Sequence, residues 1–271
     1  MSFPLDTTDA LGQAVRRDSP PRRIVSLVPS QTELLADLGL DEEVVGLTRF
    51  CIHPEGWKKR KAIVGGTKQV RVEKVRALAP DLVLANREEN TRADVEALAA
   101  FAPVYVTDVA TVAEALAMIR TVGLLVGREA EADALTTDIE TGFASLSSSP
   151  SLRAAYLIWR APWMAVGGDT FVSDVMARAG FANVFAERTR YPEVTAADLR
   201  AARPDVLLLS SEPYPFREKH LVEVEALAAD VPAVLVDGEL FSWYGSRMRR
   251  APAYLAALRD RLANHPASAV R

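Results

Sequence analysis

An internal repeat constrains the fold of this 271-residue chain more than any other feature of its sequence. One copy contains Val75-Arg-Ala-Leu-Ala-Pro-Asp-Leu-Val-Leu84 and continues to Val95-Glu-Ala-Leu98. The other contains Leu199-Arg-Ala-Ala-Arg-Pro-Asp-Val-Leu-Leu208 and continues to Val224-Glu-Ala-Leu227. A glutamate follows the Pro-Asp pair at the same spacing in both copies, and only the second copy then carries five extra residues. A chain that repeats one supersecondary unit in each half is expected to fold into two similar lobes.

Each copy has the pattern of a helix, a Pro-Asp turn, a short apolar strand, a second helix and another short apolar strand. Continuous apolar runs are typical of strands that are buried on both faces of a parallel sheet. Such runs predict strands at residues 24–28, 44–48, 82–85, 104–106, 155–159, 206–209 and 233–236. Ser30-Gln-Thr-Glu33 predicts a capping box for a helix that ends at Gly39. The expected fold class is therefore α/β, with two doubly wound lobes that contain parallel sheets.

The segment between the two halves has the apolar periodicity of helices, with a break expected at residues 123–127. Residues 128–146 would form a helix of about 28 Å at 1.5 Å per residue, which is long enough to join two lobes as one backbone helix. We therefore expect an N-terminal lobe at residues 1–110, linking helices at 111–149 and a C-terminal lobe at 150–271.

Charge and hydropathy exclude several kinds of partner. The net charge of −4, without a block of lysine and arginine, provides no attraction for nucleic acid or anionic lipid. No segment reaches about 18 consecutive apolar residues, so no membrane insertion is expected. Residues 1–23 lack the basic stretch and apolar core of a signal peptide. The expected location is therefore cytoplasmic, and a periplasmic or surface-anchored location is the alternative if an export signal was removed.

Several motifs together resemble a known family. They are Asp9-Ala-Leu-Gly12, Pro21-Arg-Arg-Ile-Val-Ser-Leu27, Pro29-Ser-Gln-Thr-Glu33, Gly65-Gly-Thr67, Gly168-Asp-Thr170 and Gly180-Phe-Ala-Asn-Val-Phe185. Over nearly the whole chain, they resemble the substrate-binding proteins with a helical backbone (class III), which bind vitamin B12, ferric siderophores, haem or metal. The cobalamin-binding branch and its leaderless bacterial members are most similar.

The resemblance implies a non-enzymatic protein of the type that serves ABC transporters. Such a protein would hold a corrinoid such as cobalamin, a haem, a ferric siderophore or a similar metal-containing anion in a cleft between the lobes. The resemblance also implies an ABC permease as a partner if the chain is exported.

Aromatic and cationic side chains are concentrated directly after the predicted strands. In doubly wound sheets, ligands bind outside the carboxyl ends of the strands. Tryptophan and tyrosine provide large rigid contact surfaces, and arginine donates paired hydrogen bonds to carboxylates. The candidate ligand-binding residues are Arg49, Phe50, His53, Lys68, Trp159, Arg160, Trp163, Tyr214, Phe216, Trp243, Tyr244 and Arg247. The alternative is that the tryptophans only cover the hydrophobic core at the strand ends.

Two pairs of residues carry separate hypotheses. Glu88 and Glu212 occupy equivalent positions of the repeat, and the resemblance implies that they meet arginines of a permease; solvated surface acids are the alternative. Cys51 and His53 could ligate a metal, or His53 alone could be an axial ligand of a cofactor metal. Cys51 and His53 could also serve as nucleophile and base of a hydrolase, or take part in a corrinoid- or metal-dependent enzyme that uses the same cleft. No paired histidines or G-x-S-x-G motif supports the enzyme hypothesis.

Overall fold

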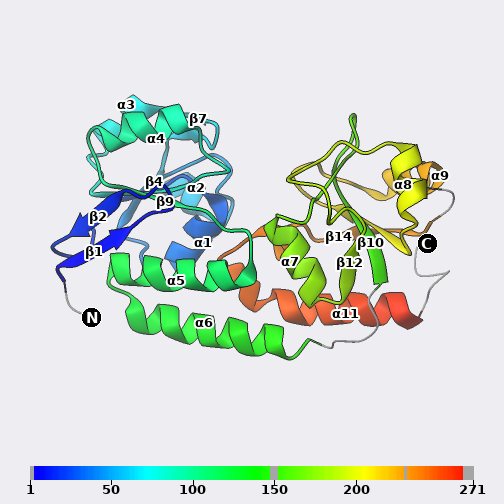
Figure 1. Ribbon diagram of the computed structural model, residues 1–271. Coiled ribbons are helices and arrows are strands. Elements are labelled where there is room, and N and C mark those ends of the chain that lie inside the picture. Colours follow the sequence, from blue (N-terminus) through cyan, green and yellow to red (C-terminus); the bar gives the residue numbers. More distant parts are fainter. Residues whose placement is uncertain (1–2, 147–151, 229–230, 265–271) are drawn as a thin grey trace. The chain divides into compact units, whose positions relative to one another are not determined.

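The computed structural model describes residues 3–146, 152–228 and 231–264 (Figure 1). Its internal contacts divide the chain into two compact units. Unit 1 comprises Met1–Val109, Ala113–Asp138 and Tyr244–Arg247, and unit 2 comprises Ala110–Val112, Ile139–Trp243 and Met248–Arg271. The sequence-based boundaries at residues 110 and 149 remain a prediction, and the second of them lies outside the described residues.

Unit 1 contains a five-stranded parallel sheet in the order β5-β4-β3-β8-β9. Its strands are β3 (Ile24–Ser26), β4 (Val44–Leu47), β5 (Ala62–Ile63), β8 (Leu82–Asn86) and β9 (Val104–Thr107). Helices α3 (Val72–Ala77) and α4 (Arg92–Ala99) cover one face of this sheet, and α1 (Pro29–Asp37) and α5 (Val112–Val126) cover the other (Figure 1). Both faces are therefore buried, as the continuous apolar runs of the strands predict.

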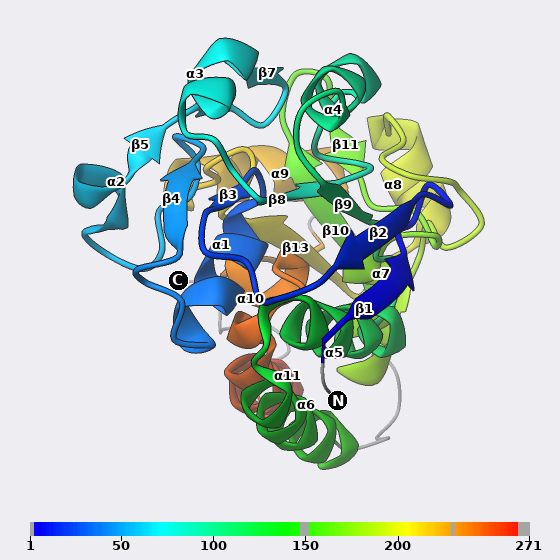
Figure 2. The same cartoon turned by 90° about the vertical axis from the view of Figure 1, so that its left-hand side faces the viewer.

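Smaller elements complete unit 1. A hairpin of β1 (Leu5–Thr8) and β2 (Ala14–Arg17) lies beside the edge strand β9 (Figure 2), where the Ala10 N–H donates to the Val106 carbonyl over 2.9 Å. A second hairpin joins β6 (Gly65–Gly66) and β7 (Gln69–Val70), and α2 (Trp57–Arg60) precedes it. The sequence analysis predicted neither hairpin, because their strands are short and lie at the edge of the unit.

Unit 2 repeats this architecture with a sheet in the order β11-β10-β13-β14, in which β12 also pairs with β10. Its strands are β10 (Leu152–Trp159), β11 (Met164–Ala165), β12 (Phe181–Asn183), β13 (Val206–Ser210) and β14 (Ala233–Val236). All pairs are parallel except β10 with β11. Helices α8 (Ala196–Ala202) and α9 (Leu221–Leu227) lie on one face, and α7 (Phe171–Arg178) and α11 (Ala251–Asn264) lie on the other (Figure 1). The remaining elements of unit 2 are α10 (Glu239–Ser242) and the 3₁₀ helix η1 (Glu218–His220). A further 3₁₀ helix, η2 (Ser246–Arg249), is divided by its contacts between unit 1 and unit 2.

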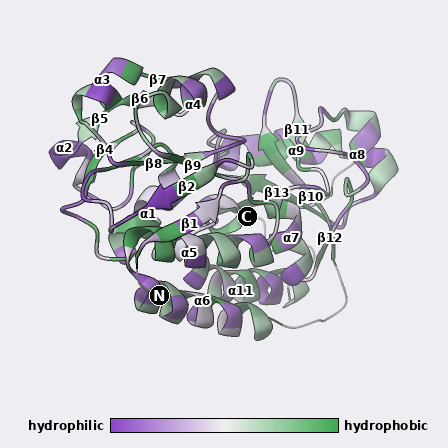
Figure 3. Cartoon of the chain, turned by 60° about the vertical axis from the view of Figure 1, so that its left-hand side comes forward, coloured by the Kyte–Doolittle hydropathy of each residue, from purple (hydrophilic) through white to green (hydrophobic). Residues whose placement is uncertain are grey.

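Each unit has its own hydrophobic core. In unit 1, alternate residues of the strands, including Val25, Val83 and Ala85, pack with Val75 of α3 and Leu98 of α4. In unit 2, the equivalent layer consists of strand residues that pack with α8 and α9. Figure 3 shows strands β10 and β13 in green, whereas helices α3 and α8 carry both purple and green segments. The helices thus turn one apolar face to a sheet and one polar face to solvent.

The Pro-Asp pair has the same structural role in both units. Asp81 accepts a hydrogen bond from the Arg23 N–H (3.0 Å), and its own N–H donates to the Arg23 carbonyl (2.9 Å). Asp205 accepts from the Arg153 N–H (2.8 Å) and donates to the Arg153 carbonyl (2.7 Å). In both copies, the guanidinium of that arginine donates to a carbonyl three residues before the aspartate. The sequence repeat is therefore a repeat of structure down to individual hydrogen bonds.

All seven predicted strands are present, but the predicted capping box is wrong. Helix α1 begins at Pro29, and Val28 is its N-cap without a side-chain hydrogen bond. Proline is favoured at the first helical position because its missing N–H would have no intrahelical partner there. Ser30 therefore lies inside the helix, and Glu33 forms an ion pair with Arg247 instead of a cap.

The helical pattern between the repeats forms two helices. Helix α5 ends at Val126, and Gly127 follows with a φ of +70°, a left-handed conformation that glycine adopts more readily than other residues. Helix α6 (Glu129–Ala144) follows and corresponds to the helix predicted at residues 128–146. By its contacts, α6 belongs to unit 1 up to Asp138 and to unit 2 from Ile139. The prediction of a break within 123–127 and of one helix shared by both halves agrees with this arrangement.

Candidate functional site

In unit 1, an exposed pair of side chains follows strand β4. The Arg49 guanidinium carbon lies 4.9 Å from the centre of the Phe50 ring, and the Phe50 side chain is 48% exposed. The Arg49 N–H donates to the Gly65 carbonyl over 2.8 Å, which joins the pair to the β6–β7 hairpin. Within the described part of the chain, the Arg49 guanidinium forms no ion pair. The pair can therefore offer a ligand both an aromatic surface and hydrogen-bond donors.

Gly66 packs closely beneath this pair. A Cβ atom at position 66 would lie 3.2 Å from the Phe50 ring and 3.3 Å from the Arg49 guanidinium. These distances are shorter than ordinary van der Waals contact, so a side chain here would require the ends of Arg49 and Phe50 to shift by a few tenths of an ångström. The Gly-Gly sequence thus serves close packing under two candidate ligand-binding residues.

The turn after strand β8 holds Glu88 by backbone contacts. The Asn86 side-chain oxygen accepts hydrogen bonds from the N–H groups of Glu88 (2.8 Å) and Glu89 (3.1 Å). The Lys68 ammonium group donates to the Glu88 carbonyl, and the Tyr244 hydroxyl donates to the Glu89 carboxylate over 3.2 Å. Glu88 is half-buried at this turn, and its predicted docking role stays a prediction.

Arg247 does not lie on an exposed surface. Its guanidinium donates two hydrogen bonds to the Glu33 carboxylate, at 2.7 and 2.6 Å, and the residue is only 6% exposed. Tyr244 is also buried, at 8% exposed. A buried ion pair of this geometry satisfies both charges, so we exclude Arg247 from the proposed ligand-binding residues.

In unit 2, a pair of aromatic side chains lies at the carboxyl end of the sheet, with Trp159 exposed and Tyr214 half-buried. Trp159 is the last residue of β10 and is 40% exposed. Its ring centre lies 5.6 Å from that of Tyr214, with an edge-to-face angle of 68°. Tyr214 comes from the five extra residues that follow β13 in the second copy of the repeat. This pair gives unit 2 a rigid aromatic surface, and its predicted ligand-binding role stays a prediction.

Two other predicted aromatic residues belong to the core. Phe216 is 5% exposed, and its ring stacks on that of Trp163 with centres 6.0 Å apart and planes at 7°. Both pack against the cluster that α8 and α9 form with the sheet. Phe216 therefore belongs to the core and Trp163 is half-buried against it, which favours the alternative interpretation, and the ligand-binding role of both residues stays a prediction.

Arg160 is held by a neighbouring helix. Its guanidinium forms a two-pronged ion pair with Glu223 of α9, with nitrogen–oxygen distances of 2.9 to 3.1 Å. The hydrogen bond to Glu223 raises the pKa of Arg160 above its usual value, with a smaller contribution from Tyr214. Arg160 is therefore a fixed cation beside the aromatic pair.

Glu212 accepts hydrogen bonds instead of extending into solvent. Its Oε1 atom accepts from the Ser242 hydroxyl (2.5 Å) and from the Trp243 indole N–H (2.9 Å). Burial raises the pKa of Glu212 above its usual value. Trp243 itself is only 8% exposed. The structure thus gives Glu212 an internal role in holding Trp243, and its predicted docking role stays a prediction.

Cys51 does not support a metal site or a nucleophile. Its thiol is fully buried, between the hydroxyls of Thr32 (3.1 Å) and Thr48 (3.2 Å). Burial raises the pKa of Cys51, so the thiol stays protonated, whereas a nucleophile or metal ligand must be a thiolate. His53 is half-buried two residues later. Among the described residues, no three His, Cys, Asp or Glu side chains are grouped as a metal site requires.

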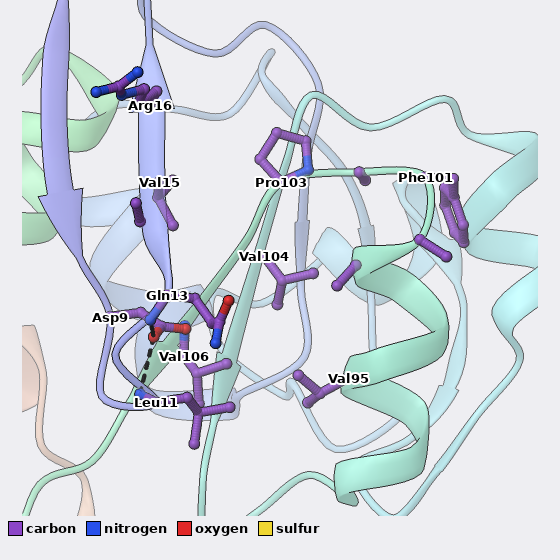
Figure 4. Close-up of a pocket in the computed structure, with 14 residues that line it drawn as sticks. Asp9, Leu11, Gln13, Val15, Arg16, Val95, Phe101, Pro103, Val104 and Val106 are labelled. Carbon is purple, nitrogen blue, oxygen red and sulfur yellow. Dashed lines mark hydrogen bonds between the residues drawn. The ribbon is translucent and has the colours of Figure 1, made fainter.

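Two cavities in unit 1 contain none of the candidate residues. One, of about 590 Å³, lies between the β1–β2 hairpin and helix α4, where Leu11, Val95 and Val106 point toward the same space (Figure 4). The other, of about 760 Å³, shares these three residues and extends to Arg87 and polar residues of α4. The sequence analysis did not predict them, although Leu11 belongs to the Asp9-Ala-Leu-Gly12 motif.

No helix in the described ranges combines the length and the apolar character that crossing a membrane requires.

Comparisons with known proteins match most of the chain. Residues 24–235 match the family described as periplasmic binding protein. An uncharacterized ABC transporter substrate-binding lipoprotein, YvrC of Bacillus subtilis, is 30% identical over 219 residues, which are 76% of this chain and 69% of that protein. A vitamin B12-binding protein of Pectobacterium carotovorum is 25% identical over 236 residues, which are 84% of each chain.

Solved structures show the same fold. The periplasmic heme-binding protein RhuT of Roseiflexus superimposes with a TM-score of 0.76 at 21% identity. The match covers 92% of this chain and 99% of that one. At this identity the likeness establishes the fold, which agrees with the predicted α/β class.

Proposed function

Because the chain belongs to the periplasmic binding protein family, we propose that it is a substrate-binding protein of the ABC-transporter type whose ligand is a macrocyclic metal complex, a corrinoid in the first place and haem in the second. The family consists of binding proteins, and this chain is a binding protein and not an enzyme. The buried, protonated thiol of Cys51 agrees with that conclusion.

The aromatic pair of exposed Trp159 and half-buried Tyr214 is the observation that supports the ligand class. Two aromatic rings at the carboxyl end of the unit 2 sheet form a rigid surface on which a flat ring system can stack. The fixed guanidinium of Arg160 lies beside them, and Arg49 and Phe50 offer a similar combination on unit 1. A corrinoid or haem combines a large ring with carboxylate or amide side chains, which these donors can bind. The vitamin B12-binding relative and the heme-binding structural neighbour support the same class.

The first test is titration of the purified protein with cobinamide, cobalamin and haemin, followed by absorbance and by calorimetry. We expect saturable one-site binding of at least one corrinoid. Binding of a ferric siderophore alone would contradict the macrocycle proposal and leave only the broader assignment as a substrate-binding protein.

The Trp159→Ala substitution tests the aromatic surface. Ring stacking contributes about 1 kcal/mol beyond buried area, so we expect the Kd of the bound macrocycle to rise at least fivefold. Val222→Ala is the matched control, because Val222 is an exposed apolar residue of α9 (73% exposed) and should leave the Kd unchanged. Equal affinity of Trp159→Ala and the wild type for the same ligand would remove Trp159 from the proposed site.

The protein partner that we propose depends on the compartment in which the protein is found. The family name refers to the periplasm, and the Bacillus subtilis relative is a lipoprotein. The sequence analysis predicts the cytosol, where the protein would carry or sense its ligand without a permease. Fractionation of the native host with an antibody separates these proposals. Recovery outside the cytosol would support an ABC permease as partner, with Glu88 as the first candidate for docking, and would contradict the cytosolic prediction.

A further inference from the structure

We propose that His220 is a positioning residue for ligand binding: it anchors the five-residue insertion of unit 2 and makes the Tyr214 hydroxyl a hydrogen-bond donor for a carboxylate or amide oxygen of the ligand. This inference rests on the proposed function, because it assigns one contact within that ligand site.

The insertion distinguishes the two copies of the repeat. In the first copy, seven positions separate Glu88 from Val95, whereas twelve separate Glu212 from Val224 in the second. The additional residues place Tyr214 edge-to-face against Trp159, and they have no equivalent beside strand β8. The insertion therefore contributes to the exposed aromatic surface only in unit 2.

His220 contacts the segment that contains this insertion through four interactions. Its Nδ1 atom accepts a hydrogen bond from the Arg217 N–H over 2.9 Å, and its Nε2 atom lies 3.3 Å from the Tyr214 hydroxyl oxygen. Its ring meets those of Tyr214 and Phe216 at their edges, with centres 5.5 and 5.6 Å apart. His220 is only 5% exposed, so these contacts hold the ring in one orientation.

The contact at Nδ1 determines the tautomer. A nitrogen that accepts from a backbone N–H carries no hydrogen, so the neutral ring must carry its hydrogen on Nε2. Nε2–H then donates to the Tyr214 oxygen, and the hydroxyl hydrogen of Tyr214 must point elsewhere. The described residues provide no acceptor for that hydrogen. Tyr214 therefore presents a donor to whatever binds on the aromatic surface, and the matching ligand group is an acceptor.

Protonation of His220 at low pH would remove the hydrogen bond that Nδ1 accepts. A protonated imidazole donates from both nitrogens, so Nδ1 could no longer accept from the Arg217 N–H. The charged groups around His220 are Lys219 beside it, Arg160 after β10 and Glu223 of α9, and Tyr214 is the other titratable group in contact. Burial lowers the pKa of His220, as do Lys219 and Arg160, while Glu223 acts in the opposite direction. The lowered pKa favours the neutral ring, so loss of the contact is expected only at a pH below the usual pKa of histidine.

The tautomer can be tested without any ligand. Long-range ¹H–¹⁵N correlation spectra of the histidine rings at pH 7.5 should show His220 as the Nε2–H tautomer. The Arg217 amide should exchange slowly with solvent in the wild type and faster in His220→Phe, which removes the acceptor. An Nδ1–H tautomer, or a protonated ring at pH 7.5, would overturn the proposal whether or not a macrocycle binds.

Titration with cobinamide then tests the positioning role. We expect Tyr214→Phe and His220→Phe each to weaken cobinamide binding about three- to tenfold at pH 7.5. The double variant should bind cobinamide with about the same affinity as the single variant that binds it less tightly. His220→Asn, whose side-chain oxygen can replace Nδ1 as acceptor, should recover part of the affinity. Wild-type affinity should fall as the pH is lowered and His220 becomes protonated, and that of His220→Phe should change less over the same pH series.

Additive effects of the two Phe variants, or a folded His220→Phe protein with wild-type affinity and pH profile, would contradict the positioning role. If the wild type binds none of the macrocycles, the proposed function fails, while the tautomer and exchange results still decide whether His220 anchors the insertion.

Discussion

At the scale of single residues, burial separates the candidate ligand-binding residues into two groups. Trp159 and Phe50 are exposed at strand ends and can contact a ligand, whereas Phe216 and Arg247 are almost fully buried. The residue types are the same in both groups, so composition alone could not divide them. An aromatic ring or a guanidinium serves packing or binding according to which atoms already surround it.

Glu212 allows a test of pH dependence at this scale. Because burial raises its pKa in the folded protein above the usual value, the fold favours the protonated carboxyl. Its contribution to stability is therefore complete below the usual pKa of about 4.3 and is lost as the pH rises through the raised value. Glu212→Gln keeps an oxygen that can accept from Trp243 and never ionises. We therefore expect the free energy of unfolding of Glu212→Gln to increase relative to that of the wild type as the pH rises from 4 to 8.

Urea unfolding at several pH values measures this difference. Glu218→Gln is the control, since Glu218 is an exposed glutamate of the same unit and should show a smaller change over the same range. A difference between Glu212→Gln and the wild type that does not vary with pH would show that the carboxyl is not destabilised by its burial.

At the scale of elements, a short segment ties a distant part of the chain into unit 1. Tyr244–Arg247 follows α10 in sequence but packs with unit 1, where Arg247 pairs with Glu33 of α1. A Cβ atom on Gly245 would lie 2.7 Å from the Ser30 carbonyl oxygen, which shows how closely the segment approaches that helix. Glu33 is thus a structural anchor and not the capping residue that its spacing from Ser30 suggested.

Removal of one charge of this pair should destabilise the protein strongly. Because Arg247→Met would leave the Glu33 carboxylate buried without its counterion, we expect a loss of about 3–5 kcal/mol in the free energy of unfolding. The double variant Glu33→Gln/Arg247→Met should recover part of this loss, because no charge remains buried. Chemical denaturation of the wild type, of the single variants Glu33→Gln and Arg247→Met and of the double variant measures the coupling. Additive losses would show that the two residues do not act as a pair.

At the scale of the whole molecule, ligand binding should increase the free energy of unfolding. A ligand that binds only the folded state at 100 times its Kd adds about 2.7 kcal/mol to the free energy of unfolding. We expect cobinamide to raise the unfolding temperature of the wild type, and to raise it less at the same concentration in Trp159→Ala. Hydrogen exchange should slow in the loop that follows β13, where Tyr214 lies. A macrocycle that binds without any rise in unfolding temperature would indicate adsorption to unfolded chains instead of a folded site.

The sequence by itself determined the α/β class, the repeat, all seven predicted strands and the aromatic character of the strand ends. These features depend on periodicity and on the order of residues, which the chain carries locally. Tertiary structure alone decided which strand-end residues are exposed, that Glu33 pairs with Arg247 across more than 200 positions, and that His220 faces Tyr214. Burial and long-range pairing depend on which elements pack together, and the spacing of residues along the chain does not contain that information.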